Sequence, residues 1–129
     1  MSNIISSDQV TINVNDQSAH TEVVHEIVRR LVQGMQPKQI FLFGSLAYGQ
    51  PAEGSDIDLM VIVSESDCPP HRRAQAAYAC VGAVGVAKDL LVLTEEEFER
   101  QARVATSLAR LVKEQGKILY ERREESSGS

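Results

Sequence analysis

The segment Ile57 to Val63 constrains the fold of this chain more than any other part of the sequence. Apart from Asp58, every residue in it is apolar, so both faces of the segment avoid water. A strand that is apolar on both faces lies inside a sheet whose two sides are covered. The sequence therefore predicts an α/β or α+β domain in which helices flank a small mixed sheet.

Strand and helix patterns alternate around this central run. Apolar residues at three- and four-residue steps indicate amphipathic helices, and short apolar runs bounded by Gly or Pro indicate strands. In chain order the predicted elements are a strand over 10–14, a helix over 21–35, strands over 39–43 and 57–63, a helix over 70–84, a strand over 86–93, helices over 94–103 and 106–115, and a strand over 117–120.

Length and composition favour a single core. The 129 residues are 43% hydrophobic, enough for one domain and too few for two ordinary ones. We expect a polar leader over 1–18, one domain over 19–121, and a disordered tail over 122–129, where charged residues give way to Ser and Gly.

Net charge, cysteine spacing and hydropathy argue against several classes of protein. Thirteen basic residues against 18 acidic ones give a formal net charge of -5, which argues against an extended nucleic-acid-binding surface. Cys68 and Cys80 lack neighbours at metal-ligand spacing and suit free thiols in a reducing compartment. No apolar run approaches the roughly 20 residues of a membrane span, and no signal segment is evident. We expect a cytoplasmic protein without a membrane partner.

Two carboxylates stand at the head of the central strand. Because strand side chains alternate between faces, Asp56 and Asp58 project to the same side while Ile57 points into the core. Close like charges beside a core are costly unless a cation offsets them. Carboxylates on a rigid strand suit magnesium, which completes its shell with water and phosphate oxygens.

Asp89 is the only acidic residue in the predicted strand over 86–93. If that strand lies beside the one that carries Asp56 and Asp58, three carboxylates meet. Such a trio holds two metal ions in the arrangement used for in-line nucleotidyl displacement. The sequence alone does not establish that the two strands are neighbours.

Gly44 and Ser45 follow the strand over 39–43 and begin a helical turn over 45–48. Glycine lets a phosphate approach the backbone, the serine hydroxyl donates a hydrogen bond, and the free amides at the start of a helix favour an anion. We therefore expect Gly44 and Ser45 to bind the triphosphate of a nucleotide.

The spacing of Gly-Ser, ten residues and Asp-x-Asp over 44–58 resembles the signature of the polymerase beta nucleotidyltransferase superfamily. The segment over 88–99 resembles the part of that family that carries the third carboxylate. The resemblance implies two magnesium ions, ATP as nucleoside triphosphate, and transfer of AMP to a hydroxyl. The short chain is similar to the minimal nucleotidyltransferase branch, whose members adenylylate a tyrosine of a HEPN-domain toxin and act as its antitoxin.

One departure from the family concerns Leu46 and Tyr48. Related sequences commonly have arginines at these positions, so two triphosphate contacts are absent here. Arg72 and Arg73 are either substitutes for these contacts or part of a solvated helix face. The glutamates over 95–97 suit helix capping rather than metal binding.

Two alternative functions remain open at the level of sequence. The first is transfer to a small molecule such as an aminoglycoside, although nothing after Asp89 resembles a substrate domain. The second is an antitoxin that occludes its toxin without catalysis, which the residues at Leu46 and Tyr48 would suit. Homo-oligomers and hetero-oligomers are both compatible with the sequence.

Overall fold

The computed structural model describes residues 19–44, 57–85 and 88–122. In chain order the elements are α1 (Ala19–Met35), β1 (Gln39–Phe43), β2 (Ile57–Val63), α2 (Pro70–Val81), β3 (Lys88–Thr94), α3 (Glu95–Ala102), α4 (Leu108–Gln115) and β4 (Lys117–Glu121). The predicted strand over 10–14, the helical turn over 45–48, the polar leader and the tail beyond residue 122 lie outside the described residues.

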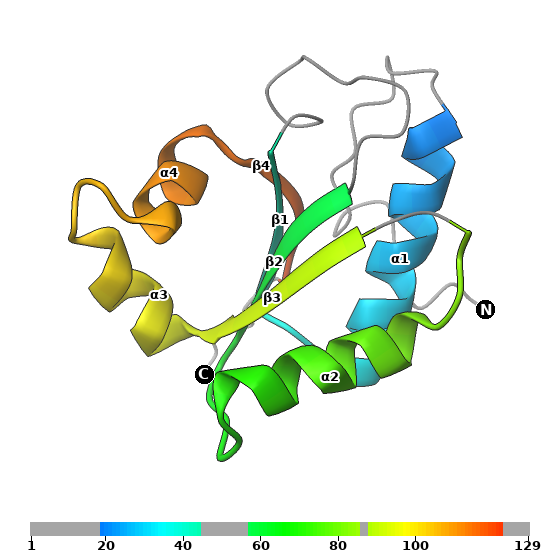
Figure 1. Ribbon diagram of the computed structural model, residues 1–129, viewed down its shortest axis with the longest axis horizontal. Coiled ribbons are helices and arrows are strands. Elements are labelled where there is room, and N and C mark those ends of the chain that lie inside the picture. The colour runs from blue at the N-terminus through cyan, green and yellow to red at the C-terminus, as the bar shows by residue number, and fades with distance from the viewer. Residues whose placement is uncertain (1–18, 45–56, 86–87, 123–129) are drawn as a thin grey trace.

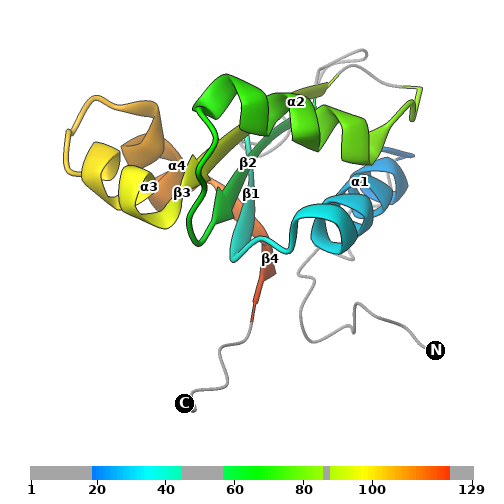
Figure 2. The ribbon, with the colours of Figure 1, turned by 90° about the horizontal axis from the view of Figure 1, so that it is seen from below.

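The four strands form one mixed sheet in the order β3-β2-β1-β4. Strand β1 is antiparallel to β2 and to β4, whereas β2 and β3 are parallel. Helices α1 and α2 cover one face of the sheet, and α3 and α4 lie on the other, as two perpendicular views show (Figures 1 and 2). The prediction of a small mixed sheet flanked by helices is confirmed.

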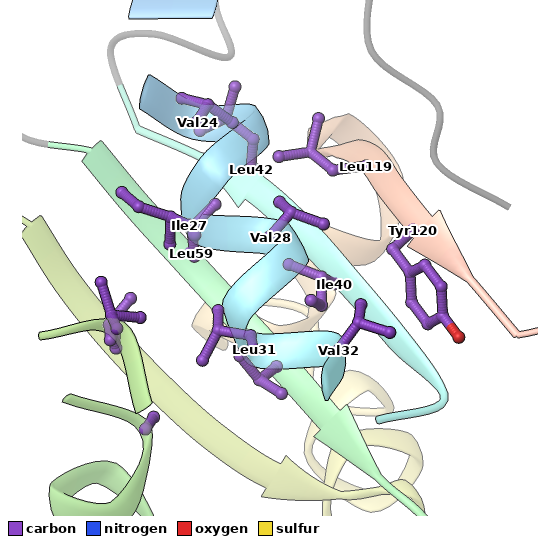
Figure 3. Close-up of a cluster of buried hydrophobic side chains, with 14 of the residues drawn as sticks. Val24, Ile27, Val28, Leu31, Val32, Ile40, Leu42, Leu59, Leu119 and Tyr120 are labelled. Carbon is purple, nitrogen blue, oxygen red and sulfur yellow. The ribbon is translucent and has the colours of Figure 1, made fainter. Parts of the chain in front are cut away.

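The larger core lies between the sheet and α1. One face of this amphipathic helix places Ile27, Val28 and Leu31 against the sheet with no exposed surface (Figure 3). On the sheet side they meet Ile40, Leu42, Leu59, Leu119 and Tyr120. Burying one such aliphatic side chain stabilises a fold by about 1.5–3 kcal/mol, so this contact fixes α1 to the sheet.

The smaller core lies on the opposite face, beneath α3 and α4. Phe41 stacks on Phe98 of α3 with ring centroids 5.5 Å apart. Met60 and Ile62 of β2 are buried in the same cluster. Strand β2 is thus covered on both faces, which explains why its sequence is apolar throughout. Asp58 belongs by strand alternation to this face.

A β-bulge explains the packing of β4. The pairing between β1 and β4 passes from Ile40–Tyr120 to Phe41–Ile118, which leaves Leu119 as an extra residue. An extra residue disrupts the alternation of side chains. Leu119 and Tyr120 are consecutive, yet both are buried in the α1 core. Both therefore help to hold α1 on the sheet.

Helix α2 is shorter than predicted. It ends at Val81 rather than at 84, because Gly82 adopts a φ of 67° and its N–H donates to the carbonyl of Tyr78. The guanidinium of Arg30 donates to the carbonyl of Val81, which also stabilises this end. Within the part of the chain described, no helix has the length and hydrophobicity needed to cross a membrane.

Candidate active site

Asp58 and Asp89 lie directly opposite each other on neighbouring strands. They are Cα partners in the parallel pairing of β2 with β3. Paired residues on parallel strands point to the same face, and adjacent strands lie about 4.8 Å apart. The assumption that these two strands are neighbours is thereby confirmed, and two of the three predicted carboxylates stand together.

Gly44 closes the site on the side of β1. Phe43 is the partner of Asp58 in the β1–β2 pairing, so the next residue passes beside the carboxylate. Gly44 has a φ of 80°, and a Cβ atom added to it would lie closer than 3.0 Å to Oδ2 of Asp58. The backbone conformation favours glycine at this turn, and a side chain here would require the Asp58 carboxylate to move.

Asp56 and Ser45 lie outside the described residues, so their roles stay predictions. Within the ranges 19–44, 57–85 and 88–122, no group of three His, Cys, Asp or Glu side chains is placed to hold a metal ion. Asp58 and Asp89 supply two carboxylates there, and Asp56 is the predicted third. This set of oxygen donors fits magnesium. The missing side chain of Gly44 leaves room for the carboxylate of Asp58 beside the backbone.

Tyr78 contacts Asp89, and sequence reasoning missed it. The phenol comes from α2, near the helix end that lies next to the start of β3. Its hydroxyl lies 3.3 Å from Oδ1 of Asp89 and accepts a hydrogen bond from the N–H of Leu90 at 3.0 Å. In a single sequence, a tyrosine in an alanine-rich helix carries no signal for such a contact.

Arg73 does not contact the site. Its side chain is buried, and it donates to the carbonyls of Cys68 and Val92 and to both carboxylate oxygens of Glu97. These partners lie at the opposite end of β3 from Asp89. The hypothesis that Arg73 contacts the triphosphate is therefore wrong, and so is the alternative of a solvated helix face.

Glu97 links this ion pair to the start of α3. The side chain of Thr94 accepts from the N–H of Glu97, and Glu97 accepts from the N–H of Thr94, which confirms the predicted capping box. The hydrogen bond from Arg73 lowers the pKa of Glu97 to about 2. The predicted capping role of the glutamates is confirmed for Glu97.

An apolar pocket of about 250 Å³ lies along the edge strand β3. Leu91 and Leu93 line it from the strand, and they share the face of Asp89 because strand side chains alternate. Pro70 and Ala74 of α2 and Leu108 of α4 line its sides. The pocket therefore lies on the same face of the sheet as the carboxylates, toward the end of β3 that is farther from Asp89.

Solved structures with a similar fold include a crystal structure of a protein from Sulfolobus solfataricus that is assigned as a nucleotidyltransferase. It is 21% identical to this chain with a TM-score of 0.58, and the match covers 78% of this chain and 79% of the other. A toxin-antitoxin crystal structure with AMP-PNP matches at 23% identity and a TM-score of 0.49, over 77% and 73% of the two chains. The structure of a mutant of the toxin-antitoxin MntA-HpeT matches at 20% identity and a TM-score of 0.46, and the match covers 77% of this chain and 73% of the other.

Among curated proteins, no relative of this chain was found. The family described as "Polymerase beta, Nucleotidyltransferase" matches residues 25–125. This range contains the strands of the sheet, Gly44, and both paired carboxylates. Because the match spans most of the sequence, the chain belongs to the polymerase beta nucleotidyltransferase family.

Proposed function

We propose that this protein is a magnesium-dependent nucleotidyltransferase that moves AMP from ATP to a hydroxyl group. The observation that carries the proposal is the direct pairing of Asp58 with Asp89, with Gly44 packed against Asp58. Two carboxylates held together beside a glycine turn supply ligands for a divalent cation. A glycine backbone also lets a phosphate approach its amide closely.

Each residue of the site has a distinct role in this proposal. Asp56, Asp58 and Asp89 would hold two magnesium ions, which supply positive charge to stabilise the phosphates during displacement. Gly44 admits the triphosphate to the backbone, and the hydroxyl of Ser45 donates a hydrogen bond to it. Asp89 accepts the proton of the acceptor hydroxyl.

The bond changes follow from an in-line displacement. The acceptor oxygen forms a bond to the α-phosphorus of ATP, and the bond from that phosphorus to the bridging oxygen breaks. Pyrophosphate leaves with the electron pair, and the proton of the hydroxyl passes to Asp89 and from there to water. The product is an adenylylated hydroxyl.

The proposed acceptor is a tyrosine of a HEPN-domain toxin, so that the chain acts as an antitoxin. Two features support a protein acceptor. The signature over 44–58 in a short chain resembles the minimal nucleotidyltransferase branch. In addition, a pocket on the same face of the sheet as Asp89 is lined by Leu91, Leu93 and other apolar groups, which suit a protein side chain better than a charged sugar.

The test combines the purified protein, a co-expressed HEPN toxin, magnesium and ATP labelled at the α-phosphate. We expect label on a tyrosine of the toxin, located by peptide mass spectrometry. Asp58→Asn and Asp89→Asn are expected to lower the transfer rate by at least about 100-fold. Asp67→Asn, a change at an exposed acid between β2 and α2, is the control and keeps the wild-type rate.

Other outcomes identify the alternatives. A toxin that is neutralised equally well by wild type and by the Asp58→Asn, Asp89→Asn double variant would show an antitoxin that acts by binding alone. Label that appears on an aminoglycoside and never on the toxin would show a small-molecule nucleotidyltransferase. Either result would refute a protein acceptor.

A further inference from the structure

The hydroxyl of Tyr78 is held by strand β3. It accepts a hydrogen bond from the backbone N–H of Leu90 at 3.0 Å, and its own proton has two acceptors within reach. One is Oδ1 of Asp89 at 3.3 Å, and the other is the carbonyl of Lys88 at 3.5 Å. The carboxylate is charged and closer, so it is the stronger acceptor. Tyr78 thus joins the end of α2 to the start of β3.

Asp89 needs such a partner because packing does not fix it. The residue is exposed and lies near the beginning of β3, which is an edge strand. An exposed carboxylate samples several rotamers, and restricting them costs conformational entropy when a metal binds. A hydrogen bond from a hydroxyl that the strand itself holds selects one orientation in advance.

We propose that Tyr78 is a positioning residue for Asp89, an inference that rests on the proposed function. By donating to Oδ1, the hydroxyl orients the carboxylate so that Oδ2 is presented to a divalent cation. Hydrogen bonds to metal-ligating carboxylates commonly change metal affinity or activity by about 10- to 100-fold. Tyr78 contacts no substrate in this proposal and acts only through Asp89.

The variant Tyr78→Phe removes the hydroxyl and keeps the ring. The probe is Mn²⁺ together with α,β-methylene ATP, which cannot release pyrophosphate, and binding is followed by electron paramagnetic resonance. We expect the dissociation constant for Mn²⁺ to rise about 10-fold in Tyr78→Phe. Tyr120→Phe, a change at a buried tyrosine of β4, is the matched control and keeps the wild-type constant.

A double-mutant cycle separates positioning from a structural role. If Tyr78 acts through Asp89, the Tyr78→Phe change has little further effect on Mn²⁺ binding in an Asp89→Asn background, so the two effects are not additive. The melting temperature of Tyr78→Phe is measured alongside. Unchanged Mn²⁺ binding in Tyr78→Phe, fully additive effects, or a wild type that binds no Mn²⁺ would each overturn the inference.

These binding measurements do not depend on transfer activity. The wild type could bind Mn²⁺, lose affinity for it in Tyr78→Phe, and yet transfer no AMP. That result would refute the proposed function and leave the role of Tyr78 intact. An active wild type whose Mn²⁺ binding does not change in Tyr78→Phe would refute the role of Tyr78 alone.

Discussion

Gly44 and Asp58 are packed so closely that a side chain at position 44 would require the Asp58 carboxylate to move. A Cβ atom there would collide with Oδ2 of Asp58, and the φ of 80° disfavours any side chain. In Gly44→Ala we therefore expect the Asp58 carboxylate to be displaced and AMP transfer to fall by about 100-fold. The initial rate of transfer at saturating ATP measures this effect.

Gly85→Ala is the matched control for that change. Gly85 has a similar φ of 81°, but a Cβ atom on it would meet nothing within 4 Å. Both variants should lose about 1 kcal/mol of unfolding free energy through backbone strain. Only Gly44→Ala should lose activity. Equal losses of activity in the two variants would show that strain, and not the contact with Asp58, causes the defect.

The pairing of Asp58 with Asp89 predicts that magnesium reverses the effect of Asp89→Asn on stability. Like charges directly opposite each other on adjacent strands are destabilising. Without magnesium, Asp89→Asn should therefore raise the free energy of unfolding. With magnesium at 10 times its dissociation constant, the wild type gains about 1.4 kcal/mol and becomes the more stable protein. Urea titrations with EDTA and with MgCl₂ test both signs.

The ion pair of Arg73 with Glu97 predicts a loss of stability at low pH. The hydrogen bond from Arg73 lowers the pKa of Glu97 from 4.5 to about 2 in the folded protein. A lowered folded pKa stabilises the fold above the unfolded pKa, and this contribution disappears as the pH falls from about 4.5 through about 2. Its full size is on the order of 3 kcal/mol.

Glu97→Gln tests this prediction because glutamine can still complete the capping box at its position. We expect the variant to be less stable than wild type at pH 7, and the difference to shrink as the pH falls from 4.5 to 2. Glu96→Gln is the control, since that side chain is 86% exposed. Urea denaturation followed by circular dichroism at several pH values measures the difference. A difference that stays constant with pH would contradict the shifted pKa.

Arg72 offers a test of the end of α2 that lies away from the carboxylates. Arg72 is exposed in the first turn of α2, which follows the C-terminal end of β2 in the chain. Asp58 lies near the N-terminal end of the same strand. The five residue-to-residue steps from Asp58 to Val63 span roughly 16 Å. Arg72→Gln should therefore leave the KM for ATP within about twofold of wild type. A tenfold rise would place the triphosphate at this end of the sheet.

The sequence predicts the strands of this fold better than their tertiary contacts. The bounds of β1 and β2 follow from apolar runs that end at Gly44 and at polar residues, and both are confirmed. The sequence pattern predicts the end of α2 three residues too late, because the positive φ of Gly82 is not visible in composition. The bulge at Leu119 also leaves no trace in the hydropathy pattern, since both of its buried residues look like ordinary strand residues.

In the candidate site, too, the sequence predicts the carboxylates better than their tertiary contacts. The sequence identifies Asp58 and Asp89 as candidate ligands but leaves the adjacency of their strands as an assumption, which the structure confirms. The contact between Tyr78 and Asp89 and the burial of Arg73 depend on how α2 packs against β3. These are tertiary contacts between residues far apart in the chain, and the periodicity of a single sequence does not encode them. Asp56 and Ser45 stay predictions.

The parallel pairing of β2 with β3 has a consequence for biosynthesis. Two parallel strands cannot be joined by a tight turn, so the whole of α2 separates Asp58 from Asp89 along the chain. A ribosome-bound chain therefore cannot bring these two carboxylates together until the crossover helix has docked and β3 has emerged. Under the proposed function, the ability to bind a cation through both carboxylates therefore arises late in synthesis, and an incomplete translation product would lack it.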